Sequence, residues 1–402
     1  MANDITFLLD TLKEIITLFK IKRLVFLFDE AAHTFIPSQQ EIFFEIFKLL
    51  HGDKIAVKAA VYPSVTSYGR NFDIGHDAIV ISMDRFDTGE SGRKANRELF
   101  RDMLIKRLPK NGKVKKQLFS KAHLIDECID LSTGNPRAFF HLLIRTFDKG
   151  YSDRSLLLST QEFVDQELVP YHLNLTKRLP KYGNHVRIGF ELLRGYIVPE
   201  IRKKNFRNKL SKYQSAYFTI QRDMSPNLKL SLDILCYSGL LSAQGTVKIA
   251  ERRTGLRYMV HLALLLNEKA FSTVKISDAI NSLSLTDYRE FSIADKEILK
   301  YVKQLKSVSG MCPNCSAHIE PNAKFCPECG KKVSSVSIVG ALLEEPISSL
   351  SISDYLKHTV SSTFPKVGSV ILADRDEIMK IKYIKQVRSR IIKNAAEEFI
   401  SG

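Results

Sequence analysis

Four of the six cysteines are arranged in two closely spaced pairs. Within each pair two residues separate the cysteines, and ten residues separate the pairs. The four residues are Cys312, Cys315, Cys326 and Cys329. Two thiolates at this spacing can bind one metal ion from a tight turn, and a second such pair completes a closed tetrahedral site. We therefore predict that these four cysteines bind one structural Zn²⁺ ion.

The residues beside the cysteines support the same interpretation. Pro313, Pro327 and Gly330 stand where such turns need a fixed or left-handed backbone. A disulfide framework is the alternative, but an intracellular chain without other paired cysteines argues against it. The segment resembles the short zinc-ribbon modules of prokaryotic proteins. The other two cysteines, Cys128 and Cys236, lie in apolar surroundings and are expected in the core.

A second set of candidate residues begins near the N-terminus. Residues 22–33 read KRLVFLFDEAAH, so that an apolar run ends in Asp29 and Glu30. A buried strand that ends in two carboxylates could hold Mg²⁺ and polarise a water molecule. Ser64 and Thr66 follow the next predicted strand, and Arg137 lies at the start of a predicted helix in STGNPRAF.

In this order and spacing, these residues resemble those of the AAA+ and STAND ATPases, especially the relatives of the origin-recognition ATPases. The resemblance covers roughly residues 5–265. It implies that Asp29 and Glu30 form a Walker B motif, in which Asp29 positions Mg²⁺ and Glu30 polarises the attacking water. It also implies that Ser64 or Thr66 is the sensor 1 residue. Arg137 would be the sensor 2 arginine of a helical lid, directed at the γ-phosphate.

The sequence departs from this family in one respect. It contains no G-x-x-x-x-G-K-[ST] motif, whose backbone amides and lysine hold the β- and γ-phosphates. Two explanations are open. The first is that the chain is a gene fragment or has a mis-called start, and the second is that it has a degenerate ATPase fold. The intact Asp29, Glu30 and Arg137 favour the first. We expect negligible ATP hydrolysis by this chain, and Mg²⁺ and ATP as cofactors only if the missing loop is supplied.

The elements that must position the acidic pair follow from hydrophobic periodicity. Residues 4–19 and 40–50 predict helices, and residues 24–28, 55–62 and 78–83 predict strands. This alternation indicates a parallel sheet. The first strand is entirely apolar, which predicts a central strand covered on both faces.

The fold class predicted for the whole chain is multidomain α/β. We expect a partial parallel-sheet ATPase core with a helical lid, then a winged-helix-like α+β domain, a small zinc ribbon and a C-terminal helical unit. Within the third domain, a helix should precede a hairpin whose strands are LLSA and TVKIAERR. The predicted domain boundaries are 1–92, 93–175, 176–305, 306–335 and 336–402.

The C-terminal segment and the overall charge both indicate a nucleic-acid partner. Residues 376–400 predict a short helix, a tight hairpin at Tyr383–Lys385 and a second helix, and they resemble helix-hairpin-helix DNA-binding modules without their hairpin glycines. A two-helix packing unit with a solvated basic face is the alternative. The formal net charge of +16 favours a polyanion, with DNA preferred. The candidate phosphate contacts are Lys382, Lys385, Arg388 and Arg390.

The sequence leaves three functions open. The first is an ATP-binding-type DNA-binding protein that is inactive as an ATPase in this chain. The second is a non-enzymatic, zinc-containing nucleic-acid-binding or adaptor protein, and the third is a fragment of a defence or signalling ATPase. A homo-oligomer or a protein partner is compatible with each. In related assemblies a neighbour's arginine completes the site, and the candidates here are Arg97, Arg101 and Arg107.

The sequence predicts no membrane association. No apolar run approaches the roughly 18 residues of a membrane-spanning helix, and the N-terminal MANDITFLLDTLKEI carries acids within its apolar stretch, unlike a signal peptide. We therefore expect a cytoplasmic protein.

Overall fold

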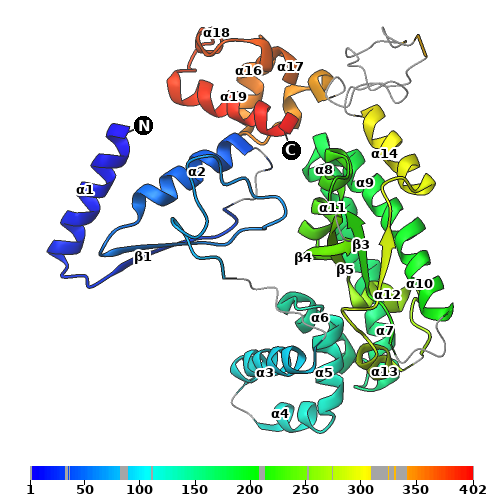
Figure 1. The fold of residues 1–402 in the computed structure, drawn as a ribbon. Coiled ribbons are helices and arrows are strands. Elements are labelled where there is room, and N and C mark those ends of the chain that lie inside the picture. Colours follow the sequence, from blue (N-terminus) through cyan, green and yellow to red (C-terminus); the bar gives the residue numbers. More distant parts are fainter. Residues whose placement is uncertain are drawn as a thin grey trace.

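The computed structural model, shown in Figure 1, describes most of the 402-residue chain. The described residues are 2–31, 35, 37–81, 89–109, 112–207, 213–250, 253–273, 275–308, 325, 330–331 and 342–401.

The N-terminal part is a small α/β unit. It contains α1 (Ala2–Leu18), β1 (Leu24–Phe28), α2 (Pro37–Leu50) and β2 (Ile55–Ala59). The two strands pair in parallel, with Leu24 opposite Ile55. The two predicted helices and the first two predicted strands are confirmed, although the second strand ends at Ala59 and not at Tyr62.

The predicted third strand at 78–83 is wrong for the residues that the structure describes. Ala78 forms only an isolated bridge with Ile74, and Ile79, Val80 and Ile81 are exposed. Ser82 and Met83 lie outside the described residues. The reason is that a short apolar run carries no periodicity of its own, so tertiary packing decides whether it joins a sheet.

The expectation that β1 is covered on both faces is also wrong within the described part of the chain. Side chains from α1, α2, β1 and β2 form one apolar cluster on one face of the sheet. On the opposite face Val25 and Leu27 are 44% and 75% exposed. Because successive residues of a strand point to opposite faces, helices on one face of the sheet leave half of an all-apolar strand uncovered.

Five helices follow in the segment predicted to be helical. They are α3 (Glu90–Arg107), α4 (Gly112–Phe119), α5 (Ala122–Leu131), α6 (Pro136–Asp148) and α7 (Asp153–Phe163). Their buried residues include Leu124, Ile129 and Phe139, and the apolar cluster that they build continues through the next segment as far as Val302.

Two long helical runs are each interrupted by one π-helical turn. The turn Val164–Leu168 (η1) joins α7 to α8 (Val169–Arg178), and the turn Leu193–Ile197 (η3) joins α9 (Gly183–Leu192) to α10 (Val198–Arg207). In both runs a proline, Pro170 or Pro199, is the second residue after the π-turn. Proline has no N–H group and its ring clashes with the carbonyl four residues earlier. A wider turn at that point lets the helix continue.

A four-stranded mixed sheet lies in the next segment. Its strands are β3 (Tyr217–Gln221), β4 (Leu241–Ala250), β5 (Arg253–Val260) and β6 (Tyr288–Phe291), in the order β4-β5-β3-β6. β3 is antiparallel to β5 and parallel to β6. The helices of this segment are α11 (Pro226–Tyr237), α12 (Leu262–Asn267), α13 (Ile276–Asn281) and α14 (Lys296–Val308).

The predicted helix before the hairpin is confirmed as α11, but the predicted hairpin is misplaced. LLSA and TVKIAERR do not form two paired strands, because residues 241–250 belong to the single strand β4, which pairs with β5. The register shifts between Ala243 and Thr246, where Gly245 has φ +83°. A glycine with positive φ serves a β-bulge as well as a hairpin turn, which explains the error. The winged-helix identity of this segment stays a prediction.

The C-terminal residues form a helical unit with its own core. Its helices are α16 (Asp354–Ser361), α17 (Val367–Leu372), α18 (Arg375–Met379) and α19 (Gln386–Ser401). Buried side chains such as Val360, Ile378 and Ile392 form its core. The predicted helix, tight turn and second helix are confirmed as α18, a turn in which Tyr383 has φ +68°, and α19. Among the described helices, none is long and apolar enough to span a bilayer.

Candidate functional site

The acidic pair lies where β1 leaves the sheet. The parallel pairing continues past the two strands, because the Ala60 N–H donates to the Phe28 carbonyl at 2.9 Å and the Ala31 N–H donates to the Ala60 carbonyl at 3.2 Å. Asp29 and Glu30 therefore leave the sheet at the edge where the chain also leaves β2. In open α/β sheets, this carboxyl edge is where ligands bind.

The backbone at Glu30 is in the left-handed region, with φ +52°. This conformation is uncommon for a residue other than glycine. The Glu30 N–H donates to Asp29 Oδ1 at 2.9 Å, so one oxygen of Asp29 holds the turn. Both side chains are exposed.

The loop after β2 is held by a buried glutamine of α2. Gln40 accepts a hydrogen bond from the Ser67 N–H at 2.6 Å and donates to the Val65 carbonyl at 3.3 Å. Thr66 Oγ1 donates to the Tyr62 carbonyl at 2.7 Å, and Ser64 is half-buried in the same loop. Sequence reasoning missed Gln40, although a glutamine at the start of the strongly apolar helix 40–50 was a signal for a buried polar contact.

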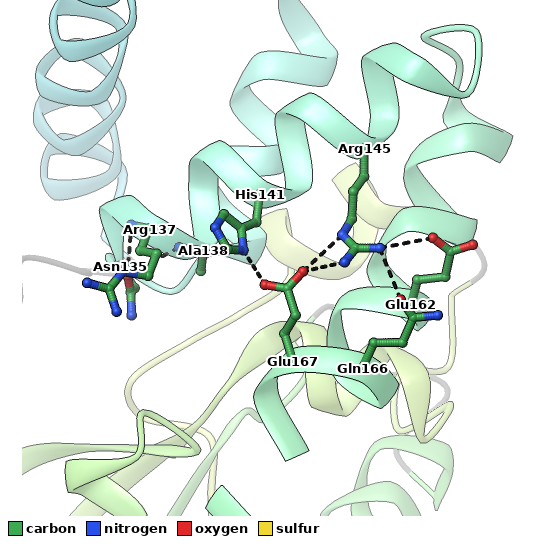
Figure 2. A network of polar contacts seen from close by, with 8 residues as sticks. All are labelled: Asn135, Arg137, Ala138, His141, Arg145, Glu162, Gln166 and Glu167. Carbon is green, nitrogen blue, oxygen red and sulfur yellow. Dashed lines mark hydrogen bonds and ion pairs between the residues drawn. The ribbon is translucent and has the colours of Figure 1, made fainter. Parts of the chain in front are cut away.

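Arg137 lies at the start of α6, as predicted. Asn135 is the N-cap, and its Oδ1 accepts hydrogen bonds from the Arg137 N–H at 2.9 Å and the Ala138 N–H at 3.2 Å (Figure 2). The turn from α5 uses Thr133 and Gly134 with φ of +53° and +81°. The Arg137 side chain is exposed.

The charges of the acidic pair and of Arg137 affect the pKa of one phenol, that of Tyr62. Partial burial raises the pKa of Tyr62, and the nearby Tyr171 raises it further. The carboxylates of Glu30 and Asp29 act in the same direction, whereas Arg137 lowers the pKa. All three predicted residues therefore affect the pKa of the same hydroxyl, although burial has the largest effect on it. The sequence analysis did not single out Tyr62.

Aromatic contacts join this edge of the sheet to the helices that follow. The Tyr62 and Tyr237 rings lie 4.6 Å apart between centroids. Phe35 lies 5.0 Å from the same Tyr237 ring, and its carbonyl accepts a hydrogen bond from Tyr182 Oη at 3.1 Å. These contacts connect the acidic edge with α11 and with the helix Pro180–Tyr182 (η2).

The helix α6, which carries Arg137 in its first turn, is tied to the π-helical turn η1 by a polar network (Figure 2). Arg145 Nε donates to Glu167 at 3.0 Å, and its Nη1 lies 3.3 Å from both Glu162 and Gln166. His141 Nδ1 contacts the other oxygen of Glu167. This network sets the position of α6 relative to α7 and η1.

The three arginines considered as candidates for an intersubunit contact all have partners within the chain. Arg97 forms an ion pair with the buried Asp130. Arg101 Nη2 lies 2.7 Å from Asp126, and the Arg107 guanidinium lies 4.4 Å above the centre of the Phe140 ring. Arg97 and Arg101 join α3 to α5, and Arg107 joins α3 to α6. Each arginine therefore helps to hold α3 against a neighbouring helix. The structure does not distinguish any one of the three as the arginine that would contact a neighbouring subunit.

The four predicted zinc ligands lie outside the described residues. Gly330, which follows the last of them, is described and has φ +65°, the left-handed backbone that the sequence analysis predicts for it. A donor set of four thiolates suits Zn²⁺. Among the residues that the structure describes, no group of three or more histidine, cysteine or acidic side chains is arranged to hold a metal ion.

The predicted phosphate contacts lie around the turn between α18 and α19. Lys382, Lys385, Arg388 and Arg390 are all exposed. Arg388 is used locally, because its Nη1 donates to the Tyr383 carbonyl at 2.8 Å and its guanidinium lies 5.6 Å from the Tyr355 ring centre. Lys385 and Arg390 form no ion pair with any residue of the described part. The turn also bears a shallow, mainly apolar hollow, lined by Met379, Tyr383, Lys385, Gln386, Val387 and Arg388.

Comparisons with known proteins identify one segment. A family model of the zinc-ribbon domain matches residues 311–333, which confirms the zinc-ribbon prediction for that segment. No curated protein and no solved structure matches the chain. The resemblance to the AAA+ and STAND ATPases stays a prediction.

Proposed function

We propose that this protein is a zinc-containing DNA-binding protein without ATPase activity of its own, and that the turn between α18 and α19 contacts DNA. The observation that carries the proposal is the group of exposed cations at this turn, on a helical unit that has its own core. Lys382, Lys385 and Arg390 project from one turn and the first residues of one helix, where they can reach neighbouring phosphates.

The charge of the chain supports a polyanionic partner. A formal net charge of +16 attracts DNA from a distance, and each neutralised phosphate releases condensed counterions. The zinc-ribbon segment immediately precedes the helical unit. When bound, Zn²⁺ would cross-link the two cysteine turns and stabilise that segment.

The absence of a phosphate-binding loop from the sequence argues for a non-enzymatic role. Without the G-x-x-x-x-G-K-[ST] backbone and lysine, a nucleotide lacks most of its phosphate contacts. DNA binding by the basic turn needs none of these parts.

The experiment measures binding of the zinc-loaded full chain to random duplex DNA as a function of salt. Replacing Lys382, Lys385 and Arg390 together by alanine should weaken binding at low salt and reduce the slope of log K against log[salt] by about one unit for each lost phosphate contact. The matched control replaces Lys13, Lys106 and Lys300, three exposed lysines of α1, α3 and α14. The proposal is wrong if wild type has little affinity at low salt, or if both triple variants behave alike.

A second candidate function, nucleotide binding at the acidic edge, is favoured by one observation. The charges of Asp29 and Glu30 raise the pKa of Tyr62 and that of Arg137 lowers it, which supports a site in which the two carboxylates bind a cation and the guanidinium binds a phosphate. Titration with Mg²⁺ and ADP tests it: binding that Arg137→Ala and Asp29→Asn each weaken supports this function. Binding that neither change affects rejects it.

A further inference from the structure

Tyr383 occupies the position in the turn where a glycine would be expected. Its backbone has φ +68°, and the residue is 62% exposed. A bulky residue in this region is uncommon and costs conformational energy. The hydrogen bond from Arg388 Nη1 to the Tyr383 carbonyl, at 2.8 Å, helps to hold the conformation. A strained turn that directs an aromatic ring into solvent suggests that the ring itself contacts a ligand.

Cations and aromatic rings alternate around this turn. Lys382 Nζ lies 5.1 Å from the centre of the Tyr383 ring. The Arg388 guanidinium lies 5.6 Å from the ring of Tyr355, which is also exposed. Aromatic faces next to cations are the elements with which proteins bind single-stranded nucleic acids, since bases stack on the rings and phosphates contact the cations.

The hollow beside the ring is better suited to a base than to a phosphate. Met379 and Val387 contribute apolar surface to it, and its lining is mainly apolar. A phosphate would be poorly solvated against such a surface, whereas the faces of all four bases are apolar and planar. In duplex DNA these faces are stacked and inaccessible, so a ring can reach them only in a single strand.

We infer that this turn binds single-stranded DNA by stacking a base on Tyr383 above the apolar hollow, with Lys385 and Arg390 on the flanking phosphates. This inference rests on the proposed function and adds the form of DNA and the contact that selects it. Arg388 acts as a positioning residue, because its guanidinium is engaged with the Tyr383 carbonyl and the Tyr355 ring.

The experiment compares the zinc-loaded full chain on an oligodeoxyuridine and on an abasic strand of the same length. Both carry the same phosphates, but only the first has bases. Wild type should bind the oligodeoxyuridine about 5- to 150-fold more tightly than the abasic strand, the range expected from one stacked base.

Two variants connect that preference to the ring. Tyr383→Asn removes the ring and keeps a residue that tolerates positive φ, so it should bind both strands equally while its circular dichroism spectrum is unchanged. Tyr383→Phe keeps the ring and should keep the preference.

The contrary outcomes separate this inference from the proposed function. Equal binding of wild type to both strands, with salt-dependent duplex binding intact, would overturn base stacking and leave the proposed function standing. No binding to any DNA at low salt would overturn both. Tighter binding of oligouridine than of oligodeoxyuridine would overturn the assignment to DNA in favour of RNA, since the two strands differ only in the 2′-hydroxyl.

Discussion

Arg145 of α6 donates hydrogen bonds to Glu167 of the π-helical turn η1 from both Nε and Nη2. The same carboxylate contacts His141, one turn earlier on α6. A carboxylate in a π-turn therefore binds two side chains of α6, the helix that carries Arg137 in its first turn. The orientation of α6 depends on Glu167, which lies 30 positions beyond Arg137 in the chain.

We expect Glu167→Gln to destabilise the protein by about 1–3 kcal/mol, the usual cost of removing one charged partner from a partly buried pair. The matched control is Glu191→Gln, which breaks the exposed ion pair between Arg187 and Glu191 and should cost well under about 1 kcal/mol. Urea denaturation followed by circular dichroism gives both values. Equal losses in the two variants would show that the network contributes no more than a surface pair.

We expect the purified chain to contain one equivalent of zinc. Replacing Cys312 and Cys315 together by serine should remove most of it, because two thiolates cannot close a tetrahedral site. Replacing Cys236, which lies outside the cysteine pairs, should leave the zinc content unchanged. Metal analysis of the three proteins checks this, and an undiminished zinc content in the double variant would reject the assigned ligands.

We expect stability to fall as the pH falls from about 6.5 towards 4. Burial lowers the pKa of His172 to about 4, so the folded protein holds this ring neutral, while the unfolded chain takes up a proton at the ordinary pKa. The contribution of this ring to the free energy of unfolding is complete above the pKa that the histidine has in the unfolded chain. It is lost as the pH falls through this window. Buried His261, whose pKa is also about 4, adds to the same loss.

The test compares the free energy of unfolding at neutral pH and near the lower end of that window. His172→Gln should reduce the difference between the two values, whereas the exposed His76→Gln should not. If His172→Gln leaves the difference unchanged, the buried ring does not set this pH dependence.

We expect no magnesium-dependent ATP hydrolysis above background by the zinc-loaded chain. Asp29 and Glu30 are predicted to bind a cation, but the sequence has no loop to hold the β- and γ-phosphates. Phosphate release by wild type and Glu30→Gln under identical conditions decides the question. Turnover that Glu30→Gln abolishes would show an active ATPase, whereas equal low rates in both would indicate contamination.

Local signals predicted local structure well. The start of α6 follows from Asn135 as the cap and Pro136 at the first turn, because both act on the backbone beside them. The turn between α18 and α19 was predicted from residues 376–400, which resemble a helix-hairpin-helix module. Predictions that depended on packing against segments distant in the sequence were less successful. Residues 78–81 are apolar yet form no strand, and Gly245 forms a bulge where a hairpin turn was expected.

The sequence by itself determined the helical periodicity, the cysteine spacing that the zinc-ribbon model matches, and the basic turn near the C-terminus. These depend on residues that are close in the chain, so type and spacing are sufficient. Only the tertiary structure decided that Asp29, Glu30 and Arg137 affect the pKa of Tyr62, that Arg97 pairs with Asp130, and that one face of β1 is bare in the described part of the chain. Such relationships join distant segments, and packing of the whole chain selects among many partners that the sequence alone leaves equivalent.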